Sequence, residues 1–124
     1  MTHKILLADD DPDIREVVAL VLEPYGIETL VASDGGEGLR MARERRDVSV
    51  IVVDLMMPRM SGGEMVRELK ADPQLRDVPV VVLSGDNLGG EKALALGAAA
   101  YLRKPVDLTT LVSTIDGLVR HGKL

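Results

Sequence analysis

Five apolar segments of strand length alternate along the chain with amphipathic segments of helix length. The apolar segments are residues 4–8, 28–32, 49–54, 80–84 and 99–102. The segments with helical spacing of apolar residues cover 11–24, about 36–45, about 63–71, about 90–96 and the stretch from 107 onward. Strands that alternate with helices indicate a parallel sheet with helices on both faces. The pattern therefore predicts an α/β fold, a (βα)5 unit arranged as a three-layer sandwich.

The ends of the predicted helices carry residues that are typical of helix ends. Asp11 precedes a proline in a first turn, and Asp34 and Asp107 stand where N-cap residues are expected. Gly97 stands where a helix C-terminus needs a left-handed residue. We expect Asp11 and Asp13 to serve the first helix as a cap and a first-turn acid rather than as metal ligands.

The order of the strands can be predicted from how apolar each one is. ILLA, VIVVD and VVVLS are almost continuously apolar, which is typical of central strands buried on both faces. ETLVA and AYL are shorter or more polar, which favours positions at the edges. A flavodoxin-like order 2-1-3-4-5 satisfies this pattern, and ligands of such sheets bind at the carboxyl ends of the strands, near the first and third strands.

Chemically active side chains follow four of the predicted strands. Asp9 and Asp10 follow the first strand, and Asp54 ends the third. Ser84 ends the fourth strand, and Lys104 follows the fifth. Under the predicted order these side chains converge on one crevice, where three carboxylates need a cation such as Mg²⁺ or Mn²⁺. The site has the parts for phosphoryl transfer, with Asp54 as nucleophile and Lys104 and Ser84 as donors to phosphoryl oxygens.

Composition narrows the function further. The chain has 124 residues, enough for one domain, and it contains no cysteine, which excludes disulfides and thiolate metal sites. Its net charge of −5 and its two aromatic residues give no basic face or stacking platform for nucleic acid. The longest apolar run, residues 78–83, is too short to cross a membrane. We expect a cytoplasmic protein that binds neither nucleic acid nor membranes directly.

Four motifs together resemble the receiver domain of two-component response regulators, in that family's order and spacing. They are ILLADDDPDI, VVDLMMPRMSG, VVLSG and GAAAYLRKPV, and the resemblance covers essentially residues 1–124 as a single domain. The resemblance implies that Asp54 is the phosphoacceptor. It also implies that Asp10 and Asp54 bind Mg²⁺ directly, that Asp9 helps through water, and that the backbone carbonyl of Met56 completes the protein ligands.

The same resemblance implies a switch and its partners. Ser84 would be the switch hydroxyl, Tyr101 the switch aromatic residue, and Lys104 the contact to the phosphoryl group, with a Lys104–Pro105 bond that is often cis in the family. A sensor histidine kinase or a histidine phosphotransfer protein would supply the phosphoryl group. The surface of the fourth helix, fifth strand and fifth helix would then change for an unidentified downstream protein, or for a phosphorylation-dependent homodimer.

The chain departs from the family pattern at the loop after the fourth strand. Gly85 stands where the family usually has alanine, and Gly89 and Gly90 follow soon after it. Because glycine adds backbone freedom, we expect this loop to be unusually soft.

Two alternatives stay open at this point. One is a receiver-like interaction module that no longer uses phosphate. The other is a Mg²⁺-dependent phosphohydrolase, which needs an acid two residues after its nucleophile, where this chain has Met56, and a substrate-binding cap for which no insertion is long enough. We therefore expect no enzymatic activity other than assistance to its own phosphorylation and dephosphorylation.

Only residues 121–124 follow the last predicted helix, so we expect no output domain within this chain. Whether the chain is a stand-alone receiver or part of a longer protein is left open.

Overall fold

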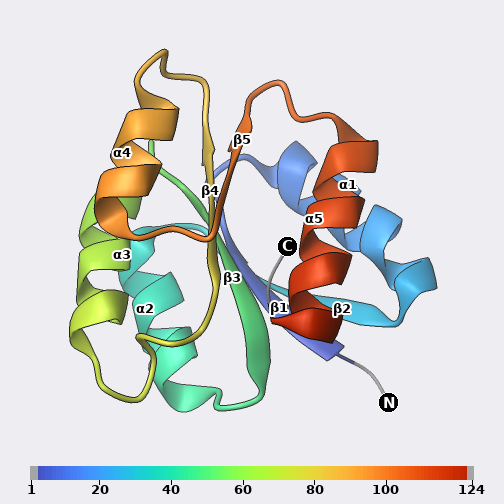
Figure 1. The fold of residues 1–124 in the computed structure, drawn as a ribbon, viewed down its shortest axis with the longest axis horizontal. Coiled ribbons are helices and arrows are strands. Elements are labelled where there is room, and N and C mark those ends of the chain that lie inside the picture. The colour runs from blue at the N-terminus through green and yellow to red at the C-terminus, as the bar shows by residue number, and fades with distance from the viewer. Residues whose placement is uncertain (1–2, 123–124) are drawn as a thin grey trace.

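The computed structural model of the chain describes residues 3–122, and it contains a five-stranded sheet with helices on both faces (Figure 1). The strands are β1 (His3–Ala8), β2 (Ile27–Ala32), β3 (Val48–Asp54), β4 (Val80–Ser84) and β5 (Ala100–Arg103). The helices are α1 (Pro12–Leu22), the short 3₁₀ helix η1 (Glu23–Tyr25), α2 (Gly35–Glu44), α3 (Gly62–Ala71), α4 (Gly89–Leu96) and α5 (Leu108–His121). The single domain was expected to cover residues 1–124, of which residues 1, 2, 123 and 124 lie outside the described residues.

The sheet is parallel and has the order β2-β1-β3-β4-β5, so the predicted fold and strand order are confirmed. The register brings the carboxyl ends of the strands to one edge. Ala8 lies opposite Val53, so the residue after β1 lies level with Asp54 at the end of β3. Asp54 in turn lies opposite Leu83, directly before Ser84.

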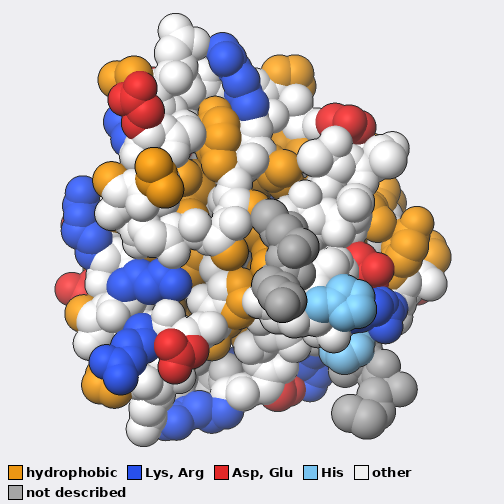
Figure 2. Space-filling model, viewed as in Figure 1, with side chains coloured by type: hydrophobic (Ala, Val, Ile, Leu, Met, Phe, Trp, Pro, Cys, Tyr) orange, Lys and Arg blue, Asp and Glu red, His pale blue; other side chains and the backbone are white. Residues whose placement is uncertain are grey.

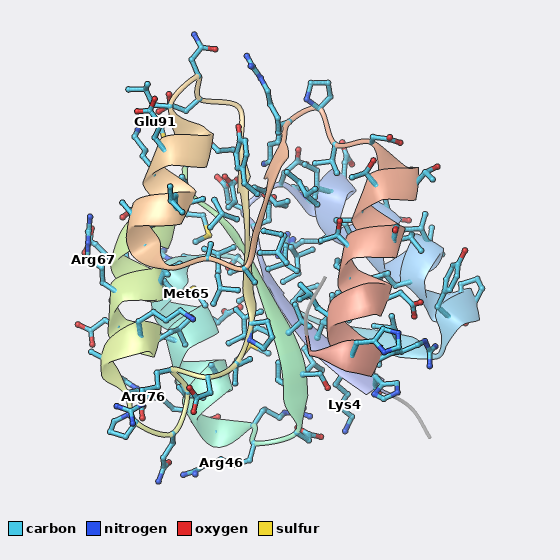
Figure 3. The ribbon with its side chains drawn as sticks, in the orientation of Figure 1. Lys4, Arg46, Met65, Arg67, Arg76 and Glu91 are labelled. Carbon is cyan, nitrogen blue, oxygen red and sulfur yellow. The ribbon has the colours of Figure 1, made fainter. Side chains whose placement is uncertain are left out.

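Alternating residues of the central strands face two separate apolar cores. On one face, Leu6, Ile51 and Val82 pack against helices α2, α3 and α4. Met65 of α3 points from its helix toward the sheet there and is fully buried (Figure 3). On the other face, α1 and α5 cover the sheet through Val18, Leu22, Leu111, Ile115 and Leu118. This two-sided burial explains why β1, β3 and β4 read as continuous apolar runs.

The residues that were predicted to cap helices do so in the structure. Asp11 accepts a hydrogen bond from the Asp13 amide, and Asp34 accepts one from the Glu37 amide. Asp107 caps α5 in the same way, and Gly97 ends α4 in the left-handed conformation. Ser61, which the helical pattern did not single out, caps α3 by accepting from the Glu64 amide.

The loop after β4 differs from the prediction. Gly89 lies in the first turn of α4 together with Gly90, so the helix begins one residue earlier than predicted and these two glycines are not part of the loop. The physical reason is a close approach: a Cβ on Gly89 would lie only 2.8 Å from the ring of Tyr101 and 2.9 Å from the Cβ of Ser84. Glycine is needed there for space rather than for backbone freedom. Within residues 3–122, none of the helices has the length and apolar character that a bilayer crossing requires.

Candidate functional site

Three aspartates meet at the carboxyl edge of β1 and β3. Asp9, Asp10 and Asp54 each place one carboxylate oxygen so that the three oxygens lie within 4.8 Å of one another. Asp9 is fully buried and Asp54 is 3% exposed, whereas Asp10 is exposed to solvent. The structure therefore brings together the three carboxylates that the strand order was expected to join.

Lys104 places its ammonium inside this cluster. Its ammonium lies 2.8 Å from Asp54 Oδ2, to which it donates a hydrogen bond, and 3.0 Å from Asp9 Oδ2. Burial acts to lower the pKa of Lys104, but the hydrogen bonds to Asp54 and Asp9 and the charges of these carboxylates outweigh it. The pKa of Lys104 is therefore raised, and the side chain stays charged at neutral pH.

The carboxylates still carry excess negative charge. Burial raises the pKa of Asp9, and the nearby charge of Asp54 raises it further, against hydrogen bonds from the Asp11 amide and Lys104. One ammonium does not balance three carboxylates. Asp9 Oδ2 is buried, and the Lys104 ammonium 3.0 Å away is its charged neighbour. Three carboxylates that supply hard oxygen donors and keep excess negative charge fit a divalent cation.

Asp54 is held by its own loop and by the helix that follows. Its Oδ1 accepts a hydrogen bond from the Met56 amide at 3.0 Å. A Cβ on Gly62 would lie 2.1 Å from the carbonyl oxygen of Asp54 and 2.7 Å from Cα of Leu55, so α3 begins directly against the backbone of the aspartate. The sequence analysis did not single out Gly62. Its only signal was the glycine pair in MSGGE.

Ser84 and Tyr101 form a connected pair on the α4 side of the cluster. Ser84 is fully buried, its hydroxyl accepts from the Asp86 amide, and its carbonyl accepts from the Lys104 amide. The Tyr101 hydroxyl is turned inward and donates to the carbonyls of Ser84 and Asp86, at 3.3 and 3.5 Å. The Lys104–Pro105 bond is cis. The backbone carbonyl of Ser84 thus joins the backbone of Lys104 to the side chain of Tyr101.

Comparison with known proteins identifies the family. The family model for the response regulator receiver domain matches residues 5–116 of this chain. Protein PilH of Pseudomonas aeruginosa is 32% identical over 118 residues, which cover 94% of this chain and 97% of that protein. Response regulator RR06 of Streptococcus pneumoniae is 39% identical over 94% of this chain, which spans about half (53%) of that relative's length.

Solved structures agree with this result. The receiver domain of Francisella response regulator 1452 superposes with a TM-score of 0.88 at 32% identity, covering 98% of this chain and 100% of that one. The family is not a classical enzyme family. The chain therefore belongs to the response regulator receiver domain family.

Proposed function

We propose that residues 1–124 form a single receiver domain in which Asp54 accepts a phosphoryl group from a phosphohistidine on a sensor histidine kinase or a histidine phosphotransfer protein. The observation that carries this proposal is the pairing of Asp54 with both a carboxylate cluster and Lys104. The cluster fits a cation, and the ammonium lies where a phosphoryl oxygen would need a positive charge.

In this reaction an oxygen of Asp54 attacks the phosphorus atom of the donor. The new bond is an acyl phosphate on Asp54, the phosphorus–nitrogen bond of the donor breaks, and the imidazole leaves with its electron pair. Lys104 donates to a phosphoryl oxygen and neutralises part of its charge. The Met56 amide, which donates to Asp54 Oδ1, keeps the carboxylate oriented during the attack. The chain assists the transfer but does not turn over a separate substrate.

Mg²⁺ or Mn²⁺ is the proposed cofactor. Asp9, Asp10, Asp54 and the backbone carbonyl of Met56 would hold the ion, with Asp9 acting through water. When bound, the ion would neutralise charge on the phosphoryl oxygens. The three carboxylates, whose charge Lys104 alone does not neutralise, support this assignment.

The phosphoryl group would shift an existing equilibrium on the α4, β5 and α5 surface. Ser84 would turn toward the phosphoryl group, and Tyr101 would follow. Figure 1 shows β5 between α4 and α5, and Figure 2 shows hydrophobic side chains exposed over α4. Leu88, which directly precedes α4, and Leu94 within α4 are 51% and 82% exposed, which supports a protein partner or a second copy of the chain at this face. Such a phosphorelay would operate in the cytoplasm.

Intact-mass measurement after incubation with acetyl phosphate tests the proposal. We expect a gain of one phosphoryl group that depends on Mg²⁺ and is absent in Asp54→Ala. Asp77→Ala, which removes an exposed carboxylate at the opposite edge of the sheet, is the matched control and should label like the wild type. Labelling of a folded Asp54→Ala variant would refute the assignment. A folded wild type that takes up no phosphoryl group from acetyl phosphate or from a histidine kinase, and binds no Mg²⁺, would favour the phosphate-independent module.

A further inference from the structure

The loop between β3 and α3, residues 55–61, is here called the acceptor loop because it follows Asp54 directly. Its base is closed by backbone hydrogen bonds: the Leu55 amide donates to Leu83, and the Gly62 amide donates to the Leu55 carbonyl at 3.2 Å. Between these points the side chain of Met56 is 69% exposed, so little packing holds it. Apart from the hydrogen bond of its amide to Asp54, the position of Met56 therefore depends on what fixes the rest of the loop.

Arg59 holds the far end of the acceptor loop. It is the one non-glycine residue among 3–122 with a positive φ, at 61°, a conformation that disfavours a side chain. Its Nη1 lies 2.6 Å from Oδ2 of Asp34, the N-cap residue of α2. The other oxygen of Asp34 accepts from the Glu37 amide at 2.8 Å. One nearly buried carboxylate thus caps a helix and fixes the loop at the same time.

A second contact lies beside this ion pair. The carbonyl oxygen of Met60 would be only 2.5 Å from a Cβ on Gly35, the first residue of α2. The loop backbone therefore rests directly on the first turn of α2. Two neighbouring contacts, Arg59 with Asp34 and Met60 with Gly35, define the same position of the loop. The pKa of Asp34 is lowered, mainly by the hydrogen bond from the Glu37 amide and next by the hydrogen bond from Arg59.

We propose that Arg59, through its ion pair with Asp34, is a positioning residue that holds the acceptor loop so that the Met56 amide and carbonyl stay at the site of Asp54. The role in metal binding rests on the proposed function, whereas the role in fixing the loop does not. The ion pair of Arg59 is with Asp34 and not with Asp54 or another proposed metal ligand. Arg59 acts on Met56 through the backbone of the residues between them, Met57 and Pro58, because its ion pair with Asp34 fixes one end of this segment.

The expected effect is modest because the guanidinium is largely exposed, with 78% of the side chain accessible. Exposed ion pairs contribute little, and the partial burial of Asp34 places this pair toward the upper end of their range. Loss of the pair should weaken Mg²⁺ affinity by about two- to five-fold. Exchange of the Met56 and Gly62 amide protons should become faster by a similar factor, because the loop leaves its closed position more often.

Arg59→Gly is the most informative variant, since glycine accepts the left-handed backbone and the fold is not threatened. Arg59→Lys retains a charge and should recover part of the effect. Arg46→Ala is the control: Arg46 (labelled in Figure 3) is exposed and makes no ion pair within the described residues. It precedes the amino end of β3, whereas the acceptor Asp54 stands at the carboxyl end of that strand. For each variant, Mg²⁺ titration followed by amide NMR signals, amide exchange rates and urea unfolding are measured on the full chain.

The proposal predicts weaker Mg²⁺ binding and faster Met56 and Gly62 exchange in Arg59→Gly, partial recovery in Arg59→Lys, and wild-type values in Arg46→Ala. Asp34→Asn, which retains a capping oxygen, should behave like Arg59→Gly, and the double variant should be no worse than either single variant. Wild-type affinity and exchange rates in Arg59→Gly would overturn the proposal. So would a loss of unfolding free energy without any change in these rates, because that is what a merely structural contact gives.

Failure of the proposed function gives a different result. If the wild type takes up no phosphoryl group and binds no Mg²⁺, yet Arg59→Gly speeds exchange at Met56 and Gly62, the function is wrong and the positioning of the loop stands. If Asp54 is phosphorylated and Arg59→Gly changes neither exchange nor Mg²⁺ affinity, the function stands and the role of Arg59 is wrong.

Discussion

Two adjacent glycines in the first turn of α3 should respond in opposite ways to the same substitution. In Gly62→Ala the added methyl group would lie 2.1 Å from the Asp54 carbonyl oxygen and 2.7 Å from Leu55 Cα, both backbone atoms. In Gly63→Ala the nearest atoms, from Arg67 and Ser61, are 3.9 Å away. The first substitution therefore forces α3 away from the acceptor strand, and the second only replaces a poor helix former with a good one.

The sizes of the two effects follow from this geometry. Normal contact at Gly62 requires a backbone shift of about 1 Å, and overpacking of this kind costs roughly 1–3 kcal/mol, here toward the upper end because no flexible side chain can yield. Gly63→Ala should stabilise by roughly 0.5–1 kcal/mol. Urea unfolding followed by circular dichroism measures both. We also expect Gly62→Ala, but not Gly63→Ala, to slow phosphorylation in variants that remain folded. Equal stability of the two variants would refute the reasoning, since it rests on the difference between these contacts.

Three further outcomes are expected. Gly89→Ala should push the Tyr101 ring outward, because the new methyl group would lie 2.8 Å from the ring and its hydroxyl, and ring-proton NMR shifts should report the move. Leu111→Ala, at a fully buried position of α5, should lower the unfolding free energy by about 2–5 kcal/mol, whereas Leu108→Ala, at a position 40% exposed, should lower it far less, as urea unfolding would show. The pKa of Asp34 is lowered on folding, so its charge adds stability in full above the ordinary value of 3.8 and loses it as the pH falls below that value. The difference in unfolding free energy between wild type and Asp34→Asn should therefore be constant near neutral pH and shrink in acid; a difference that grows in acid would contradict this sign.

The sheet could be predicted from the sequence because its signals are local. Continuous apolar runs mark β1, β3 and β4 as central strands, and capping residues such as Asp11 and Asp107 mark where helices begin. Once the strand order is known, the parallel arrangement brings the strand ends together. The meeting of Asp9, Asp54 and Lys104 then follows from topology rather than from any single motif.

Contacts between distant loops could not be predicted in this way. Arg59 and Asp34 are 25 residues apart, and arginine is not a residue that signals a left-handed turn. Gly89 was expected to add backbone freedom to the loop after β4, whereas the close approach of Tyr101 and Ser84 is what requires a glycine there. Both cases depend on how close two backbones or side chains approach. That distance is set by the assembled layers and not by local sequence.

The central claim is that Asp54 carries the phosphoryl group, and locating that group tests it most directly. The chain is phosphorylated in the presence of Mg²⁺ and then treated with borohydride, which reduces an acyl phosphate on aspartate to homoserine, and the digested peptides are sequenced by mass spectrometry. We predict homoserine at position 54 and aspartate retained at positions 9 and 10. Homoserine at Asp9 or Asp10, or a phosphoryl group found instead on His3 or His121, would contradict the account.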